Sequence, residues 1–134
     1  MSEQVARSAA NAPGMRRTRL PDRRACEGLR FDVGGVTYHG FIGRAFDRET
    51  GAVGPAREVF LTAGKPGSAV DITARDAGIC ASIALQSGAS LDALRNAVSR
   101  HENGAPEGPL GILFDEIGVQ EGRLAEDAAR NGDG

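Results

Sequence analysis

The sequence has little of what most catalytic and metal sites are built from. Its 134 residues include only two cysteines and two histidines, and no tryptophan. These four side chains are Cys26, Cys80, His39 and His101. Two cysteines exclude a disulfide scaffold and a four-cysteine zinc site, and the spacing of the four matches no zinc motif or CxxC redox pair. We therefore expect no metal ion, no catalytic residue and no cofactor bound by this chain itself.

Aromatic residues, net charge and long apolar runs are also scarce. One tyrosine and five phenylalanines are the only rings, and the formal net charge is −2. Few rings are thus available to stack on bases, and a near-neutral charge argues against a surface dedicated to nucleic acid. No run approaches the roughly 18 apolar residues of a membrane span, and no apolar run follows Met1 as in a secretory signal. These absences favour a cytoplasmic protein that does not enter a membrane.

The two ends of the chain differ from its middle. Residues 1–15 are small and polar, which predicts a disordered tail. The next segment, residues 16–24, holds five arginines in nine residues, and we call it the Arg-rich strap. Residues 119–134 are acidic and interrupted by glycine, which predicts a flexible acidic tail. One domain over residues 16–118 is expected between them, with the strap at its N-terminal end.

The first half of this domain has the pattern of a β-sheet. Residues 29–33 and 36–42 alternate apolar and polar side chains, and Gly34-Gly35 between them is a two-residue hairpin signal. A loop is expected over residues 47–55, followed by a third strand over residues 57–61. The pattern predicts an antiparallel sheet of about three strands.

The second half has the pattern of helices. Ser68 is a suitable N-cap for a helix over residues 69–86, and Gly88 is a suitable residue to end it. Ser90 similarly begins a second helix from Leu91 to about Arg100. The fold class predicted is α+β, a small antiparallel sheet packed on one face by two helices.

The first of these helices is expected to form the centre of the core. Ile72, Ile79 and Ile83 lie on one helical face, and the second half of the helix is apolar nearly all round. Cys80 is then a small buried side chain. On this interpretation an Ile79→Asp substitution unfolds the domain.

The turn before that helix is the best candidate for an anion or nucleotide site. Its candidate residues are Lys65, Gly67 and Ser68. Backbone amides at a helix N-terminus attract phosphate, and Lys65 adds a positive charge. The order of residues is not that of a Walker A loop. The alternative is a plain turn followed by an N-cap.

The Arg-rich strap is a candidate binding segment. Its arginines are Arg16, Arg17, Arg19, Arg23 and Arg24. Five arginines can contact phosphates or an acidic protein face, but no aromatic side chain lies between them. We favour a partner protein over nucleic acid, with a strap that docks on its own domain as a further alternative.

Several segments taken in order resemble the TSCPD domain, which occurs near the C-terminus of adenosylcobalamin-dependent ribonucleotide reductases and also as short stand-alone proteins. The segments are Arg16-Arg17-x-Arg19-Leu20-Pro21-Asp22-Arg23-Arg24, Gly35-x-x-Tyr38, Glu58-x-Phe60-Leu61, Gly64-Lys65-x-Gly67-Ser68, Ala81-Ser82-x-Ala84-Leu85-Gln86-x-Gly88-x-x-Leu91, Gly108-Pro109-Leu110-Gly111 and Phe114-Asp115. The Thr-Ser-Cys-Pro-Asp stretch that names the family is missing here, as is a C-terminal cysteine pair.

This resemblance implies an accessory domain of the ribonucleoside-diphosphate reductase system, which supplies deoxyribonucleotides for DNA synthesis. The radical chemistry of the oxidoreductase needs a large barrel and a cysteine triad that this chain cannot hold, so no catalytic residue is carried over. Adenosylcobalamin is implied only through the family. The expected partners are a reductase subunit and a nucleotide, with a homodimer through a sheet edge as a further expectation. The alternative function is a protein or nucleic-acid binding module that uses the Arg-rich strap.

Overall fold

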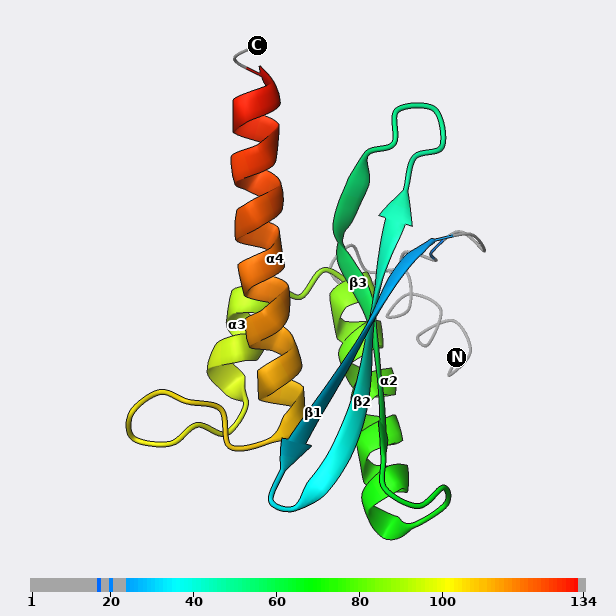
Figure 1. The fold of residues 1–134 in the computed structure, drawn as a ribbon, viewed down its shortest axis with the longest axis vertical. Helices are drawn as coiled ribbons and strands as arrows, with labels where there is room; N and C mark the ends of the chain where they lie inside the picture. The colour runs from blue at the N-terminus through cyan, green and yellow to red at the C-terminus, as the bar shows by residue number, and fades with distance from the viewer. Residues whose placement is uncertain (1–16, 18–19, 21–23, 133–134) are drawn as a thin grey trace, which may run out of the picture.

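The structure, a computed structural model, describes residues 17, 20 and 24–132 and has the α+β fold predicted from the sequence (Figure 1). Residues 1–16, and with them the expected N-terminal tail, lie outside the described residues. In chain order the elements are β1 (Ala25–Val33), β2 (Val36–Phe46), β3 (Val53–Ala63), α2 (Ala69–Gln86), α3 (Leu91–Ala97) and α4 (Pro109–Gly132).

The three strands form an antiparallel sheet in the order β1-β2-β3. The predicted hairpin between β1 and β2 is confirmed: Gly34 and Gly35 both have positive φ, 57° and 79°, which a two-residue type I′ turn requires. The strands are longer than their apolar alternation indicated. Because β2 and β3 continue pairing to Phe46 and Val53, the expected loop over residues 47–55 is shorter than predicted.

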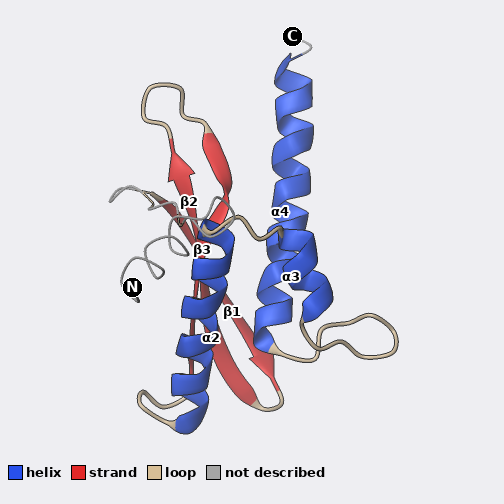
Figure 2. Cartoon of the chain, turned by 180° about the vertical axis from the view of Figure 1, so that it is seen from behind, coloured by secondary structure: helices blue, strands red, loops and turns tan. Residues whose placement is uncertain are grey.

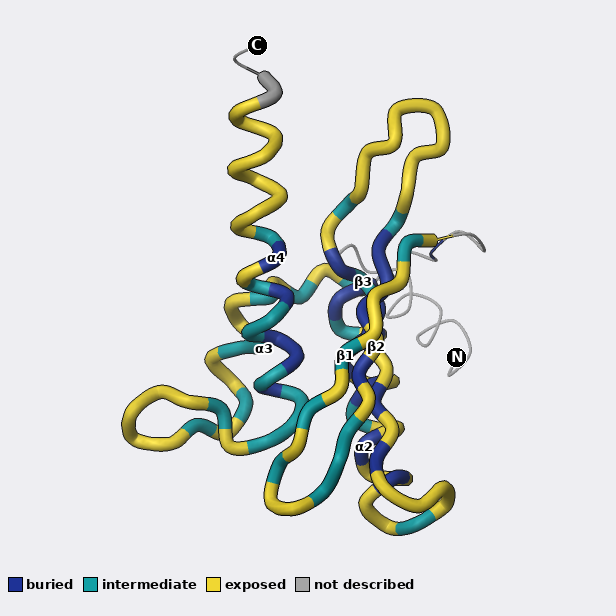
Figure 3. Tube along the Cα trace, viewed as in Figure 1, coloured by how far each residue is buried: buried dark blue, intermediate teal, exposed yellow. Residues whose placement is uncertain are grey.

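One hydrophobic core joins the sheet to α2 and α4, and the burial pattern is drawn in Figure 3. Figure 2 shows α2 running alongside β3 and α3 packed against α4. The described residues thus form three helices where two were expected. The largest fully buried side chains are Ile42, Val59, Leu61, Leu113, Phe114 and Ile117. Among the described residues no helix packs on the opposite face of the sheet, and Phe41 and Phe60 are exposed there.

The C-terminal segment differs from the expected tail, because residues 119–132 continue helix α4. Glycines earlier in the helix serve close packing. A Cβ atom at Gly111 would lie 2.8 Å from Pro106, and one at Gly118 would lie 2.8 Å from the Arg95 guanidinium. Residues 122–130 are exposed, so the acidic composition of this segment did not prevent helix formation.

The bounds predicted for α2 are confirmed. The Ser68 hydroxyl accepts a hydrogen bond from the Asp71 amide, and Gly88 after the helix has a φ of 99°. The next helix, α3, begins after Ser90 as predicted but ends at Ala97 instead of Arg100. Val98 is extended there, and a bridge between Arg100 and Pro106 closes the following loop.

The prediction that α2 is the central buried helix is wrong. Ile72 and Ile79 are each 49% exposed and Ile83 is 41% exposed. Cys80 is exposed as well, so it is not the small buried side chain that was expected. An Ile79→Asp substitution therefore places a charge in solvent, and the expected unfolding does not follow from this structure.

Candidate functional site

Helix α2 covers the free edge of β3 with polar side chains. The Ser82 hydroxyl accepts a hydrogen bond from the Val59 amide at 2.9 Å and donates one to the Val59 carbonyl at 2.8 Å. Further along, Gln86 Nε2 donates to the Arg57 carbonyl at 3.0 Å. An edge strand has a row of backbone groups without a neighbouring strand, and buried groups of this kind need partners. The inner face of α2 provides them, and it therefore carries polar side chains beside the core residues Ala74, Ala81 and Leu85.

Close approach of helix and strand completes this contact. A Cβ atom at Gly78 would lie 3.1 Å from the Leu61 amide nitrogen and 3.2 Å from the Val59 carbonyl oxygen, which leaves little room for a larger side chain. At the start of the helix, Asp71 Oδ1 accepts from the Ala63 amide at 3.1 Å. Small and polar residues on the inner face leave the isoleucines of α2 on the outer face.

The outer face carries a line of apolar side chains, Ile72, Ile79 and Ile83, which we call the isoleucine stripe. Asp76 lies on the same face, four residues after Ile72 and three before Ile79. Asp76 is exposed and has no hydrogen bond or ion pair with the residues described. The stripe is therefore an apolar surface with one unpaired carboxylate in it.

An apolar groove lies on another side of α2, between this helix, the end of α3 and the start of α4. Its volume is about 630 Å³, and Tyr38 and Leu61 of the sheet contribute to its lining. Small residues line both sides, among them Ala69, Ala77, Ala97, Gly108 and Gly111. None of the three isoleucines lines this groove, so it is separate from the stripe.

The predicted anion-site residues Lys65, Gly67 and Ser68 lie in one turn before α2, as expected. The Gly67 amide, however, donates to Asp71 Oδ2 at 3.0 Å. The amides of Gly67 and Ala63 hold the pKa of the Asp71 carboxyl below its ordinary value, so this carboxylate occupies part of the place an anion would take. Anion or nucleotide binding here stays a prediction, tested by calorimetric titration of the wild type and Lys65→Ala with ribonucleotides.

The described part of the Arg-rich strap contacts its own domain. Arg24 Nε lies 3.0 Å from the Glu58 carboxylate on β3, and Arg17 donates to the Gln86 side chain at the end of α2. Leu20 between them is buried. These contacts agree with a strap that docks on the domain. The remaining candidate residues, Arg16, Arg19 and Arg23, lie outside the described residues.

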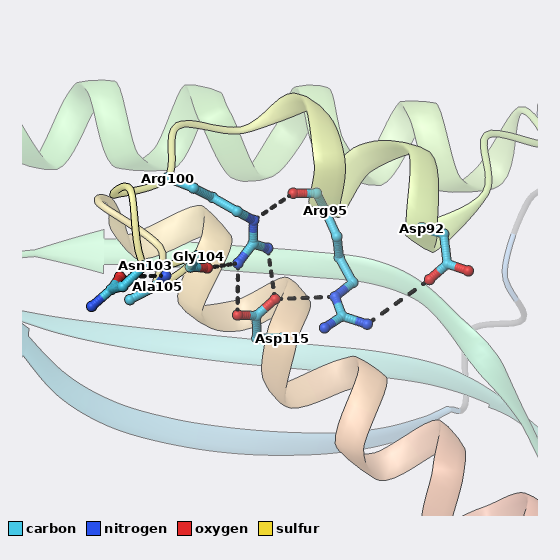
Figure 4. Close-up of polar contacts among 7 residues, drawn as sticks. All are labelled: Asp92, Arg95, Arg100, Asn103, Gly104, Ala105 and Asp115. Atoms are coloured by element: carbon cyan, nitrogen blue, oxygen red, sulfur yellow. Dashed lines mark hydrogen bonds and ion pairs between the residues drawn. The ribbon is translucent and has the colours of Figure 1, made fainter.

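A cluster that the sequence analysis missed joins α3 to α4 (Figure 4). Arg100 Nη2 and Arg95 Nε lie 2.7 Å and 3.0 Å from Asp115 Oδ1. Hydrogen bonds from Arg100, and then those from Arg95, hold the pKa of the Asp115 carboxyl below its ordinary value. Because Arg100 also donates to the Gly104 carbonyl, the cluster fixes the loop after α3 onto α4. No sequence motif indicated it, since its members are 15 or more residues apart from Asp115.

A second missed cluster joins the β2–β3 hairpin to α4. The buried Arg44 donates to Gln120 Oε1 at 2.9 Å and to Glu121 Oε1 at 3.0 Å. Gln120 Nε2 in turn donates to Glu27 Oε2 at 2.6 Å. These polar side chains lie beside a cleft of about 360 Å³, and every one of their contacts is with another part of the fold. We interpret the cluster as structural.

Chemistry-bearing side chains are not assembled in the part of the chain that the structure describes. His39 and His101 are exposed, as are both free cysteines. No group of three or more His, Cys, Asp or Glu side chains is placed to hold a metal ion among the residues described. Within the same residues, none of the helices has the length and apolar character needed to cross a membrane.

Comparisons with family models, with curated proteins and with solved structures found no match. The resemblance to the TSCPD domain therefore rests on the ordered sequence motifs, and the structure adds the isoleucine stripe as a candidate surface.

Proposed function

We propose that this chain is a non-catalytic accessory domain that binds a ribonucleotide reductase subunit through the isoleucine stripe, and so acts in deoxyribonucleotide supply in the cytoplasm. One observation carries the docking surface: Ile72, Ile79 and Ile83 are exposed in line on a helix whose other face is hydrogen-bonded to a strand edge. The sequence resemblance supplies the class of partner.

The stripe has the properties of a protein-binding surface. Its first and last isoleucines are 11 positions apart on the helix, or about 16 Å at ~1.5 Å per residue. Contiguous exposed apolar side chains mark interaction sites more often than single ones do. The contacts of α2 with β3 fix its position, so little ordering is needed on binding. These features support a preformed docking face.

The alternative, nucleic-acid binding by the Arg-rich strap, has less support. The guanidinium groups of Arg17 and Arg24 contact side chains of their own domain. An arginine paired with a carboxylate has to break that contact before it meets a phosphate. The alternative therefore serves as an outcome of the test below.

The test is binding of purified adenosylcobalamin-dependent reductase to the immobilised chain, compared between wild type, Ile79→Asp and Val119→Asp. Val119 is an equally exposed β-branched residue on α4 and serves as the matched control. We expect binding by the wild type and Val119→Asp, and at least about a tenfold loss in Ile79→Asp, because a charge in the stripe has to lose its water on docking.

Two results would contradict the proposal. One is equal binding, or equal absence of binding, by all three proteins whose circular dichroism shows them folded. The other is salt-sensitive binding of labelled RNA or DNA that Arg24→Glu abolishes, which would favour the nucleic-acid alternative.

A further inference from the structure

The spacing of the stripe identifies the kind of element that fits it. With Asp76 included, the positions on the outer face are 72, 76, 79 and 83, separated by four, three and four residues. Alternating steps of three and four residues form the narrow seam by which one helix packs along another. A strand or an irregular segment has no matching repeat. The seam therefore fits a partner helix.

Asp76 identifies the charge of that helix. Its carboxylate stands between Ile72 and Ile79, inside the seam, and has no hydrogen bond or ion pair among the described residues. Its neighbour Arg75, three residues after Ile72 and four before Ile79, borders the seam on the side opposite Asp76, and no ion pair joins the two side chains. A carboxylate covered by an apolar surface is strongly disfavoured unless a positive charge meets it. Docking therefore requires a base opposite Asp76.

A second copy of this chain does not meet that requirement. Two parallel copies of the seam bring Asp76 against Asp76, and two antiparallel copies bring Asp76 against Ile79 of the other copy. The first arrangement sets two carboxylates against each other, and the second sets each carboxylate against an isoleucine. A charged residue at one seam position is a known device for excluding self-pairing and selecting a different partner.

We infer that the isoleucine stripe receives an amphipathic helix of a partner protein, with apolar side chains against the three isoleucines and one Lys or Arg against Asp76. This inference rests on the proposed function for the existence of a partner, and it adds the partner's secondary structure and charge. The isoleucines provide most of the buried apolar area, and the Asp76 contact selects the partner and its register.

The experiment is a charge exchange with two synthetic peptides. Each is a 21-residue amphipathic helix with leucine along its seam, and they differ at one central seam position, which is Lys in one and Glu in the other. The central position aligns with Asp76 in either helix orientation. Binding of each peptide, below its self-association concentration, is measured by fluorescence anisotropy to the wild type and to Asp76→Lys. We expect the wild type to bind the Lys peptide at least about tenfold tighter than the Glu peptide, and Asp76→Lys to reverse the order.

Ile79→Ala serves to locate the binding site. It should lower the affinity for both peptides if they occupy the seam, whereas Val119→Ala on α4 should leave both affinities unchanged. Equal affinities of the two peptides, or no binding of either, would overturn the inference. So would a wild-type dimer in solution that Ile79→Asp dissociates, because a second copy would then occupy the seam.

The outcomes also separate this inference from the proposed function. If Asp76→Lys reverses the preference between the two peptides but the purified reductase does not bind the chain, the inference about the helix seam is supported and the assignment of the reductase as partner is wrong. If the reductase binds through Ile79 but is indifferent to Asp76→Lys, the proposed function stands and this inference falls.

Discussion

Helices α2 and α4 lie against the same sheet, yet the side chains that they bury differ in kind. Helix α4 buries the large apolar side chains Leu113, Phe114 and Ile117. Helix α2 buries Leu85 and small residues together with the polar Ser82 and Gln86, and it exposes its isoleucines. The difference follows from what each helix covers, because α4 adds apolar side chains to the core whereas α2 also supplies hydrogen bonds to the edge of β3.

This comparison shows how an apolar stripe reaches the surface of a small domain. The free edge of β3 needs hydrogen-bond partners, and a helix with Ser82 and Gln86 on one face provides them without another strand. The isoleucines of the other face then have no place in the core. Their exposure is a consequence of how α2 docks, and it leaves a surface available to a partner.

The largest expected effect is in α4. Phe114→Ala removes a fully buried ring and should lower the free energy of unfolding by about 3–5 kcal/mol, a large part of the roughly 5–15 kcal/mol of a typical domain. Urea unfolding followed by circular dichroism measures it. Leu124→Ala, at a largely exposed position of the same helix, is the control and should cost far less. Equal losses would mean that α4 is not packed as described.

The corresponding change in α2 acts on hydrogen bonds. Ser82→Ala leaves both the amide and the carbonyl of Val59 without their partner and should lower the free energy of unfolding by about 1–3 kcal/mol. Thr73→Ala, at an exposed position of the same helix, is the matched control and should be close to neutral. If Ser82→Ala also left the free energy of unfolding unchanged, the hydrogen bonds from Ser82 to the edge of β3 would not stabilise the fold.

The Asp115 cluster that holds α3 to α4 predicts a dependence on pH. Hydrogen bonds from Arg100 and Arg95 lower the pKa of the Asp115 carboxyl from about 3.8. The folded state therefore binds a proton at Asp115 less readily than the unfolded state does. The stabilisation is present above about pH 4 and is lost as the pH falls through the lowered pKa. The difference in urea midpoint between the wild type and Asp115→Asn should therefore shrink between pH 6 and pH 2.5, whereas Asp92→Asn, whose side chain is exposed, should show no such trend. A constant difference would contradict this account of the cluster.

The smallest effect is expected at Cys80. Because the side chain is exposed on α2, Cys80→Ser should change the free energy of unfolding by no more than about 0.5 kcal/mol. Thermal unfolding in the presence of a reductant measures it. A loss of 2 kcal/mol or more, comparable to the burial of an unpaired hydroxyl, would place Cys80 in the core after all.

The sequence predicted those parts of the fold that depend on neighbouring residues. The Gly34-Gly35 turn and the bounds of α2 follow from local backbone preferences and from the Ser68 cap, and the structure confirms them. The buried face of α2 was predicted wrongly. The hydrogen-bond partner of Ser82 is Val59 on β3, 23 residues earlier in the chain, and no local sequence pattern predicts that contact. An apolar stripe alone does not tell whether it faces a core or a partner.

The same limit applied to the candidate site. The residues of the Lys65–Ser68 turn were placed together correctly, but the carboxylate that accepts from the Gly67 amide comes from Asp71 inside α2, which the sequence analysis did not consider. The clusters around Asp115 and Arg44 depend on pairs far apart in the chain. Charged residues in such positions look like ordinary surface residues in the sequence.

The most direct test of the account is the free energy of unfolding of Ile79→Asp beside that of Ser82→Ala. If α2 docks by its polar face, Ile79→Asp stays within about 1 kcal/mol of the wild type, since the new charge remains in water, while Ser82→Ala loses about 1–3 kcal/mol. The opposite order, with Ile79→Asp unfolded and Ser82→Ala unchanged, would show that the isoleucines face the core and that the stripe is not a docking surface.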